Sequence, residues 1–179
     1  MNNVLDFPQT TTMTQLMLPI TTGPWERVLD GDQRAAAIYD RHYSRNPAAR
    51  GDPRFAGPGF KVVLLTTCMR ALFVWRVFQS KDPLAKPGDV NCAIFRNEGA
   101  GLASELIIAA EAHAIAEWGQ RRFYTYVNPR KVRSQNPGCC FIRAGWSRCG
   151  VTKTRRLLIL EKLPREKDAD VIAEWSEIG

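Results

Sequence analysis

The sequence predicts a single mixed α/β or α+β domain, and three observations support this. Its 179 residues are about one domain's worth, since domains usually contain roughly 100–200 residues. The hydrophobic fraction of 45% and the charged fraction of 24% are typical of a folded globule and exclude wholesale disorder. Segments rich in β-branched and aromatic residues alternate with helical segments, and this order is typical of a mixed domain.

The N-terminal third is expected to contain one helix and one long loop. Residues 1–24 are rich in Thr and Pro and are expected to form an extended arm or an edge strand. The segment 32–44 is predicted to be helical, because Asp32 can cap its start and Pro47 prevents its continuation. Residues 45–59 contain three prolines, three glycines and three arginines, so a long basic loop is expected there.

The rest of the chain is expected to carry the sheet and the longest helix. In chain order the expected elements are a hairpin of Phe60–Thr67 and Ala71–Gln79, a strand Val90–Phe95, a helix Leu102–Trp118, a strand Phe123–Val127, a short element Cys139–Ala144, and a final pair of strands ending with Arg156–Lys162. Gly119 is expected to end the long helix. Residues 25–163 therefore form the predicted domain, and residues 164–179 form an acidic tail or helix.

Positive charge is concentrated in one part of the chain. Lys and Arg exceed Asp and Glu by 25 − 18 = 7. Between Arg121 and Arg156 there are ten basic residues and no acidic one. A patch of one sign favours an anionic partner, either a nucleic acid or a phosphorylated cofactor. A solvated basic face is the alternative.

Three features bear on the location of the protein. The longest apolar runs, near Val62–Leu65 and Leu157–Leu160, are far shorter than the ~18–20 residues of a membrane span, so no membrane partner is expected. No basic residue precedes Arg27, which argues against a secretory signal. The five cysteines lack paired spacing, which indicates reduced thiols in a cytoplasmic protein and suits no zinc site.

A glycine-rich loop, RNEGAG at residues 96–101, lies between an expected strand and the long helix. Its two glycines allow successive amides to point into one concavity, which the positive end of the following helix also faces. Such a nest suits a pyrophosphate, and a plain strand-to-helix turn is the alternative. The loop has neither the GK[ST] ending of a P-loop nor the spacing of the dinucleotide fingerprint.

The strand, the pattern R-x-x-G-x-G and a helix beginning Leu-x-x-x-Leu resemble the acyl-CoA-binding motif of the GNAT N-acyltransferase superfamily. The resemblance covers about residues 25–163. It implies a GNAT-like domain with a central mixed, mostly antiparallel sheet flanked by helices, and acetyl-CoA or a related acyl-CoA as donor. It assigns donor binding to Phe95, Arg96, Gly99, Ala100 and Gly101, and it places the pantetheine arm along residues 93–95.

A closer resemblance rests on RHYS at 41–44, YVNP at 126–129, and NPG at 136–138 followed by AGW at 144–146. Together these motifs resemble the Mom family of bacteriophage and prophage DNA-modification proteins. The resemblance implies an anti-restriction enzyme that hypermodifies adenine N6 in DNA inside a bacterial host cell. The implied partner is double-stranded DNA with a flipped adenine.

Acyl transfer to an amine requires a base for the amine's proton and a proton for the departing thiolate. Many GNAT enzymes have a Tyr four residues before the Gly that corresponds to Gly145, but this chain has Phe141 there. The catalytic residues favoured in its place are His42, Tyr43, Tyr126 and Ser134, and Tyr124, Cys139 and Cys140 are further candidates.

The two histidines have different expected roles. His42 is expected in the last turn of its helix, where the negative end of the helix dipole favours the protonated ring. It is a candidate acid, base or metal ligand, with a packing role as the alternative, and the need for a metal ion stays open. His113 shares a helical face with Leu106 and Ala110, so a buried core histidine is expected.

Contacts to DNA are assigned to Arg45, Arg50, Arg54, Arg130, Lys131 and Arg133. Three of these cations lie in the 45–59 loop and three lie just after the strand Phe123–Val127. In the GNAT layout both segments border the acceptor cleft, where phosphate contacts would position a duplex without reading its sequence. Because adenine N6 lies inside the base stack, the base would have to be flipped or already unpaired. Phe55, Tyr124 and Tyr126 are candidates for stacking on that base.

Three functions stay open on this evidence. The leading one is a Mom-like enzyme of GNAT fold that modifies DNA bases with an acyl-CoA-type donor. The second is an N-acyltransferase for a small amine, or for an amino group of an already hypermodified base. The third is a nucleic-acid-binding protein without a working donor site, against which the intact Gly99 and Gly101 argue. Many proteins of the superfamily are dimers, so a homodimer is among the expected assemblies.

Overall fold

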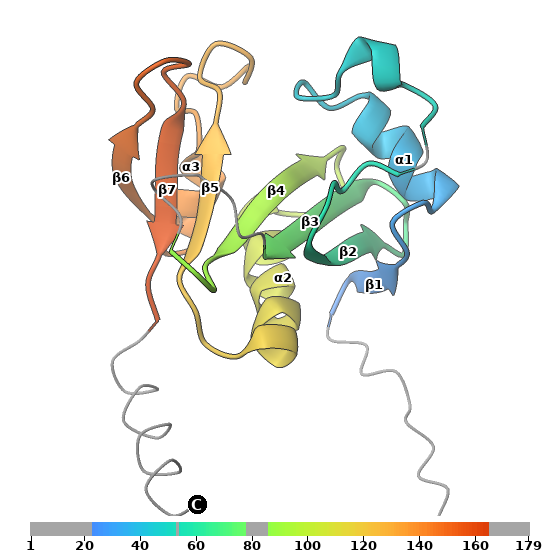
Figure 1. The fold of residues 1–179 in the computed structure, drawn as a ribbon, viewed down its shortest axis with the longest axis horizontal. Helices are drawn as coiled ribbons and strands as arrows, with labels where there is room; N and C mark the ends of the chain where they lie inside the picture. Colours follow the sequence, from blue (N-terminus) through green and yellow to red (C-terminus); the bar gives the residue numbers. More distant parts are fainter. Residues whose placement is uncertain (1–22, 53, 78–85, 165–179) are drawn as a thin grey trace, which may run out of the picture.

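The computed structural model describes residues 23–52, 54–77 and 86–164 (Figure 1). They form a seven-stranded sheet in the order β1-β2-β3-β4-β5-β7-β6, in which the β4–β5 pair is parallel and the other pairs are antiparallel. The strands are β1 (Trp25–Val28), β2 (Phe60–Thr66), β3 (Ala71–Val77), β4 (Val90–Asn97), β5 (Phe123–Val127), β6 (Ser147–Val151) and β7 (Leu158–Lys162). The helices are α1 (Gln33–Asp40), α2 (Ala103–Trp118) and α3 (Cys139–Arg143), with a short 3₁₀ helix at Pro47–Ala49. The predicted α+β domain with a mixed, mostly antiparallel sheet is confirmed.

The sheet is covered on both faces, and the alternation of side chains along β2 explains why. Val62 and Leu64 point into the core cluster that packs against α2, whereas Val63 and Leu65 point into the cluster that packs against α1. All four side chains are buried. A strand buried on both faces has to be apolar at successive positions, which is the pattern of β2 and β3.

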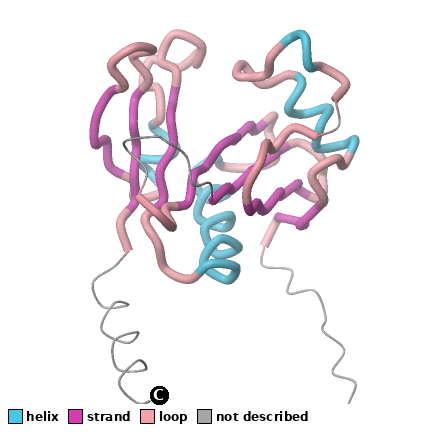
Figure 2. Tube along the Cα trace, viewed as in Figure 1, coloured by secondary structure: helices cyan, strands magenta, loops and turns pink. Residues whose placement is uncertain are grey.

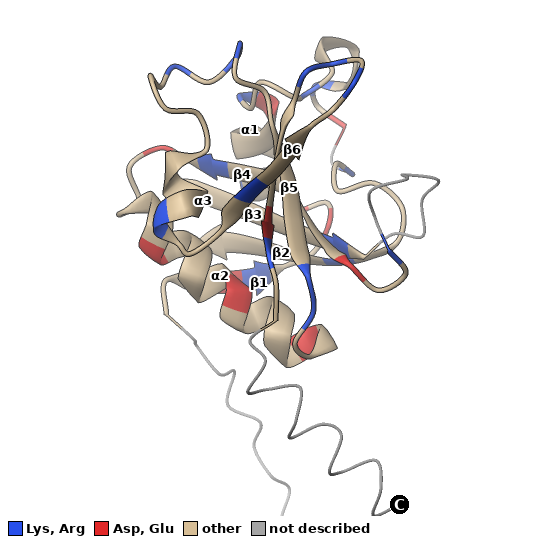
Figure 3. Cartoon of the chain, turned by 90° about the vertical axis from the view of Figure 1, so that its left-hand side faces the viewer, with Lys and Arg blue, Asp and Glu red and all other residues tan. Residues whose placement is uncertain are grey.

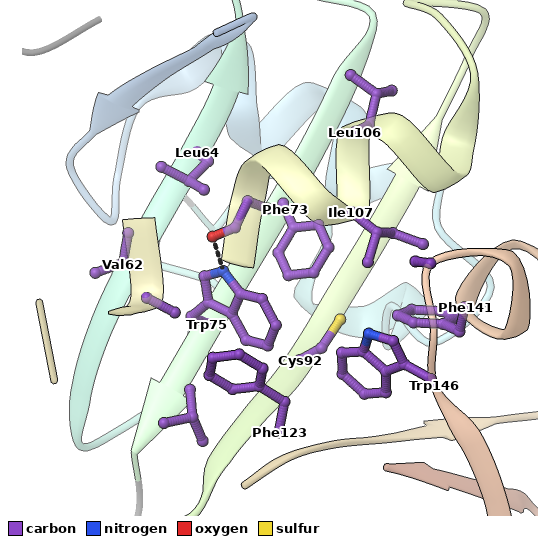
Figure 4. Packing of buried hydrophobic residues seen from close by; sticks show 14 of the residues in the cluster. Val62, Leu64, Phe73, Trp75, Cys92, Leu106, Ile107, Phe123, Phe141 and Trp146 are labelled. Atoms are coloured by element: carbon purple, nitrogen blue, oxygen red, sulfur yellow. Dashed lines mark hydrogen bonds between the residues drawn. The ribbon is translucent and has the colours of Figure 1, made fainter. Parts of the chain in front are cut away.

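Trp75 occupies the centre of the larger cluster (Figure 4). Its side chain is fully buried, and its indole nitrogen donates a hydrogen bond of 2.8 Å to the carbonyl of Ala110 in α2. The ring centroids of Phe73 and Phe123 lie 4.5 and 4.9 Å from that of Trp75. Burial of these aromatic rings fixes α2 against the middle of the sheet.

β4 is irregular where it leaves β5. Its register with β3 skips Ala93, which is the extra residue of a β-bulge. The parallel ladder with β5 has three residue pairs and ends at Cys92 and Thr125, whose hydroxyl donates to the Cys92 carbonyl at 2.9 Å. Beyond this point the two strands diverge (Figure 1). A bulge bends its strand, so the local sequence of β4 opens the sheet at this position.

The loops that follow the diverging strands gather at one end of the sheet. Figure 2 shows the segment after α1, the segment after β5 and the turn between β6 and β7 at the same end of the molecule. The opening between β4 and β5 therefore faces three loops from distant parts of the sequence.

Most element boundaries agree with the sequence prediction. Asp32 caps α1 by accepting hydrogen bonds from the amides of Arg34 and Ala35 at 2.8 and 3.2 Å. α1 ends at Asp40 rather than at Ser44, because the backbone continues as tight turns. β7 begins at Leu158 instead of Arg156, and β1 was not predicted as a strand.

Two predictions lie outside the described residues and stay predictions. These are the extended arm or edge strand over residues 1–22 and the acidic tail or helix from residue 165 onward. Within the described part of the chain, no helix is both long and apolar enough to cross a membrane.

A buried charge network fastens the C-terminal strands to α2. The carboxylate of Glu111, which is 5% exposed, accepts hydrogen bonds from the indole of Trp146 at 2.6 Å and from the ammonium of Lys162 at 2.5 Å. Lys162 also donates to the carbonyl of Ala144 at 2.9 Å. Burying the carboxylate is tolerated because both of its oxygens are paired.

This network gives the first testable prediction. We expect Glu111→Gln to lower the free energy of unfolding by about 2 kcal/mol, because it leaves the charge of Lys162 uncompensated in a mostly buried site. Glu117→Gln, on the same helix, removes an exposed ion pair with Arg27 and is expected to cost less than about 1 kcal/mol. Urea unfolding followed by tryptophan fluorescence measures both values, and equal losses would contradict the structural role of Glu111.

Candidate functional site

The glycine-rich loop curls at the start of α2 as the sequence predicts. Gly99 has φ +91°, a left-handed conformation that favours glycine. Leu102 precedes the helix and gives its first turn no side-chain cap. The side chain of Asn97, however, already accepts hydrogen bonds from the amides of Gly99 and Ala100 at 3.0 and 2.8 Å. The nest is therefore formed, and part of it is filled by a side chain of the loop itself.

Charged side chains from other elements surround this loop. Glu98 accepts hydrogen bonds from Arg41 at 2.8 and 2.7 Å and from Arg96 at 2.6 Å. Arg70, at the start of β3, donates to the backbone carbonyl of Glu98 at 3.1 Å. Sequence reasoning found Arg96 but missed Arg41 and Arg70, because only the folded chain brings the end of α1 and the β2–β3 turn to the loop.

The two guanidinium groups strongly favour the ionised form of Glu98. Hydrogen bonds from Arg41, followed by those from Arg96, lower the pKa of this carboxyl from 4.5 to about 2, against the opposing effect of burial. Glu98 is therefore charged throughout the physiological range, and the loop carries a fixed negative charge between two cations.

A cavity of about 270 Å³ lies where β4 and β5 diverge. Its lining residues are His42, Tyr43, Ser44, Ala93, Tyr126, Asn128, Lys131, Arg155 and Leu157. They come from the end of α1, the bulge of β4, the end of β5 with its following loop, and the segment before β7. The structure thus brings together three of the four predicted catalytic residues, His42, Tyr43 and Tyr126.

His42 is neutral at physiological pH, which corrects the prediction of a protonated ring at a helix end. Burial, followed by the positive charge of Arg96, lowers its pKa from 6.5 to about 4, while a hydrogen bond to the backbone of Phe95 opposes the shift. Nδ1 accepts the amide hydrogen of Ser44 at 3.2 Å and lies 2.7 Å from that residue's hydroxyl. Desolvation outweighs the dipole because the side chain is only 9% exposed. With these partners, His42 is better suited to positioning than to proton transfer.

Tyr43 packs against His42, with ring centroids 4.3 Å apart. The amide of Asn128 donates to the Tyr43 hydroxyl at 3.5 Å, so this oxygen acts as an acceptor and its own hydrogen is available to another partner. Burial raises the pKa of the phenol above 10.0, which keeps it protonated at neutral pH. Tyr43 therefore lines the cavity with a phenol that keeps its proton at neutral pH.

Other predicted site residues lie elsewhere. Ser134 does not line the cavity, and its hydroxyl accepts the amide hydrogen of Asn136 at 3.1 Å within a turn. Phe55, a predicted stacking residue, is 8% exposed and belongs to the core cluster under α1. Tyr124 is also buried, beneath the guanidinium of Arg122. His113 is half-buried rather than fully buried.

Arg45 differs most from its predicted role as a contact to DNA. Its side chain is 5% exposed, forms an ion pair of 2.8 Å with Asp40, and donates to the carbonyls of Ala49 and Asp52. It also lies over the ring of Tyr39, with its guanidinium carbon 4.9 Å from the ring centroid. Arg45 therefore organises the loop that follows it and has no surface to offer to a phosphate.

The other predicted DNA-contacting cations are exposed: Arg50, Arg54, Arg130, Lys131 and Arg133. Lys153, Arg155 and Arg156, between β6 and β7, are also exposed. Within the described part of the chain, none of these eight side chains forms a salt bridge. Figure 3 shows blue segments on the loops at the upper edge of the molecule.

Two solved structures are similar to this chain in overall fold. One is a Corynebacterium glutamicum protein described as histone acetyltransferase HPA2 and related acetyltransferase, with TM-score 0.52 and 11% identity over 79% of this chain and 96% of that chain. The other is AAC(6')-Ib in complex with Parmomycin and AcetylCoA, with TM-score 0.50 and 13% identity over 79% of this chain and 93% of that one. The fold is that of the GNAT acyltransferases. No protein-family model and no curated protein matches the chain, so the resemblance to the Mom family stays a prediction.

The GNAT fold here carries no cluster of metal-ligating side chains within residues 23–52, 54–77 and 86–164. His42 has aromatic neighbours in Tyr39 and Tyr43, and its ring nitrogens contact Ser44 and the backbone of Phe95. Both ring nitrogens thus have partners within the chain, and the role of His42 as a metal ligand stays a prediction.

The buried state of His42 can be tested by its titration. We expect the ¹H NMR signal of its Cε1 hydrogen to titrate near pH 4, and the midpoint to rise in Arg96→Gln because a nearby positive charge is removed. Since the folded pKa lies below 6.5, the unfolded chain binds this proton first, and the stability it contributes is lost as the pH falls from 6.5 towards 4. A midpoint near 6.5 in the native protein would show that the ring is solvated.

Proposed function

We propose that this protein is an acyl-CoA-dependent N-acyltransferase whose acceptor amine enters the cavity beside Tyr43. The observation that carries the proposal is the opening between β4 and β5, bordered by an arginine-rich glycine loop at the start of α2 and by a protonated phenol. The AcetylCoA named with one structure of the same fold supports this choice of donor.

The residues present fit a donor that bears phosphates. A side chain at Gly101 would meet nothing within 4 Å, so open space lies beside the loop where a ligand can approach the backbone. Arg96 and the amides of Gly99, Ala100 and Gly101 would hold the pyrophosphate, and the strand edge at Phe95 would bind the pantetheine arm. When bound, acyl-CoA supplies an acyl group as a thioester and a thiolate as leaving group.

The chain itself would contribute a general acid, the phenol of Tyr43. Tyr43 keeps its hydrogen at neutral pH and lines the cavity at the bulge of β4, where it is placed to protonate a leaving thiolate. His42 supports the Tyr43 ring from one side, and the amide of Asn128 fixes its oxygen. Tyr43 would thus act as the general acid. Many GNAT enzymes have a Tyr for this role at the position where this chain has Phe141.

The lining of the cavity favours an acceptor that is neutral before reaction. Lys131 and Arg155 are among its lining residues, and its described lining includes no carboxylate. A protonated amine would be repelled by these cations, whereas an uncharged amino group would not. Because no lining carboxylate can act as a base, the amine has to arrive uncharged. The proton that it loses on forming the amide would pass to the tyrosinate that remains after Tyr43 protonates the thiolate.

The second candidate function specifies that neutral amine as the N6 amino group of adenine in DNA, in keeping with the resemblance to the Mom family. Two groups of exposed cations favour it: Arg130, Lys131 and Arg133 after β5, and Lys153, Arg155 and Arg156 before β7. Both groups border the cavity and would bind phosphates on either side of an extruded base.

Tyr43→Phe tests the proton donor. We expect kcat for acyl transfer to fall about 100-fold, with KM for acetyl-CoA unchanged, because a positioned acid typically contributes 10²–10⁴-fold. The assay is thiol release from acetyl-CoA with a panel of amines that includes deoxyadenosine and adenine-containing oligonucleotides. Tyr39→Phe is the matched control, since Tyr39 also packs on His42 but does not line the cavity. Equal losses in both variants would exclude Tyr43 as the acid.

Mass spectrometry of nucleosides from plasmid DNA tests the choice of acceptor. Bacteria expressing the protein are expected to contain an adenosine-derived species that is absent from cells expressing Tyr43→Phe. In addition, the triple variant Arg130→Gln, Lys131→Gln, Arg133→Gln is expected to reduce the salt-dependence slope of duplex binding by about 2–3. The double variant Arg27→Gln, Arg34→Gln, which removes two positive charges elsewhere on the surface, controls for a non-specific effect of charge. Unmodified adenine together with turnover of small amines would leave only the first function.

A further inference from the structure

Three arginines from three separate elements converge on the glycine-rich loop. Arg41 follows the last turn of α1, Arg70 precedes β3, and Arg96 is the seventh residue of β4. A side chain built on Gly99 would lie 2.9 Å from a terminal nitrogen of Arg70, so this guanidinium covers the centre of the loop. The side chain of Arg41 is 51% exposed and that of Arg96 is 30% exposed. They are therefore open to a ligand in solution.

Glu98 is the carboxylate that neutralises this group. Arg41 binds it through two nitrogens, and Arg96 binds it through a third. This two-pronged contact is the geometry with which arginine recognises a carboxylate or a phosphate. Arg70 forms no ion pair with any described carboxylate, so the group retains an excess of positive charge.

Asn97 completes the same pattern on the backbone. Its amide oxygen accepts from two loop amides, and its amide nitrogen donates to the carbonyl of Gly101 at 2.9 Å. Guanidinium groups and backbone amides are the two kinds of group that bind phosphate. In this loop, Glu98 binds the guanidinium groups, and the neighbouring Asn97 binds the amides.

We propose that Glu98 is an internal substitute for a phosphate of the donor. It keeps Arg41 and Arg96 directed at the loop while the donor is absent, and it is displaced when the donor's phosphates bind. Glu98 is then a specificity-determining residue, because only a ligand with more negative charge than one carboxylate can take its place. The inference rests on the proposed function for the identity of the donor, and it adds Arg41 and Arg70 to the residues that bind it.

The direction in which donor affinity changes when Glu98 is replaced distinguishes a structural role from a competing one. A purely structural Glu98 would hold the arginines in place, so its removal would weaken donor binding. A competing Glu98 adds a negative charge that the donor's phosphates must displace, so its removal strengthens binding. Glu98→Gln separates the two roles, since glutamine keeps the size and an acceptor oxygen but loses the charge.

Isothermal titration calorimetry with CoA, dephospho-CoA and pantetheine tests the proposal. We expect Glu98→Gln to bind CoA about tenfold more tightly than the unaltered protein, and to bind phosphate-free pantetheine with unchanged affinity. A gain shared by CoA and dephospho-CoA places the competing phosphate in the pyrophosphate. A gain confined to CoA places it at the 3′ position.

Arg41→Gln and Arg70→Gln are expected to weaken CoA binding severalfold, and Glu117→Gln, which removes a carboxylate from an exposed ion pair on α2, is expected to leave it unchanged. Thermal unfolding without ligand verifies that each variant is folded.

The outcomes distinguish this inference from the proposed function. Unchanged or weaker CoA binding in Glu98→Gln, with binding intact in the native protein, would overturn the role of Glu98 and leave the acyltransferase proposal standing. Tighter CoA binding without acyl transfer to any amine would support Glu98 and count against the activity. Absence of CoA binding in both proteins would overturn both.

Discussion

The β-bulge at Ala93 is the constraint on which the rest of the site depends. A single residue outside the ladder turns β4 away from β5 after three paired residues. Had the ladder continued, the ends of both strands would have satisfied each other's backbone groups, and no space would separate them. The opening exists because the sheet is interrupted. The surrounding aromatic core, centred on Trp75, holds the interrupted strands rigid enough for the opening to keep its shape.

The segment after α1 connects the two sides of this opening. Arg41 reaches the loop before α2, His42 contacts the backbone of β4, and Tyr43 accepts the amide hydrogen of Asn128 after β5. Three consecutive side chains thus touch the glycine-rich loop, the strand before it and the segment after β5. In the proposed function, this short stretch of backbone would link donor binding at Glu98 to the position of Tyr43.

Features determined by local sequence could be predicted, and features determined by distant partners could not. The cap at Asp32, the stop at Gly119 and the strand Phe123–Val127 follow from nearest neighbours and match the structure. The pairing of Arg41 with Glu98 spans 57 positions, and no local pattern marks it. The sequence predicts that Arg45 contacts DNA, but its side chain is buried. The backbone carbonyls that bind it, those of Ala49 and Asp52, converge only when the loop has folded. His42 was predicted in the last turn of a helix, but α1 ends at Asp40, and burial, which the sequence does not reveal, controls the pKa.

The order of the strands also determines when the cavity comes into existence. β1 to β4 pair with neighbours in chain order, and the β1–β2 connection contains α1 and the short 3₁₀ helix. β7 instead inserts between β5 and β6, and its Lys162 meets Glu111 across 51 positions. The wall formed by Arg155 and Leu157 precedes β7 in the chain, so the cavity is complete only once β7, the last described strand, has paired with β5.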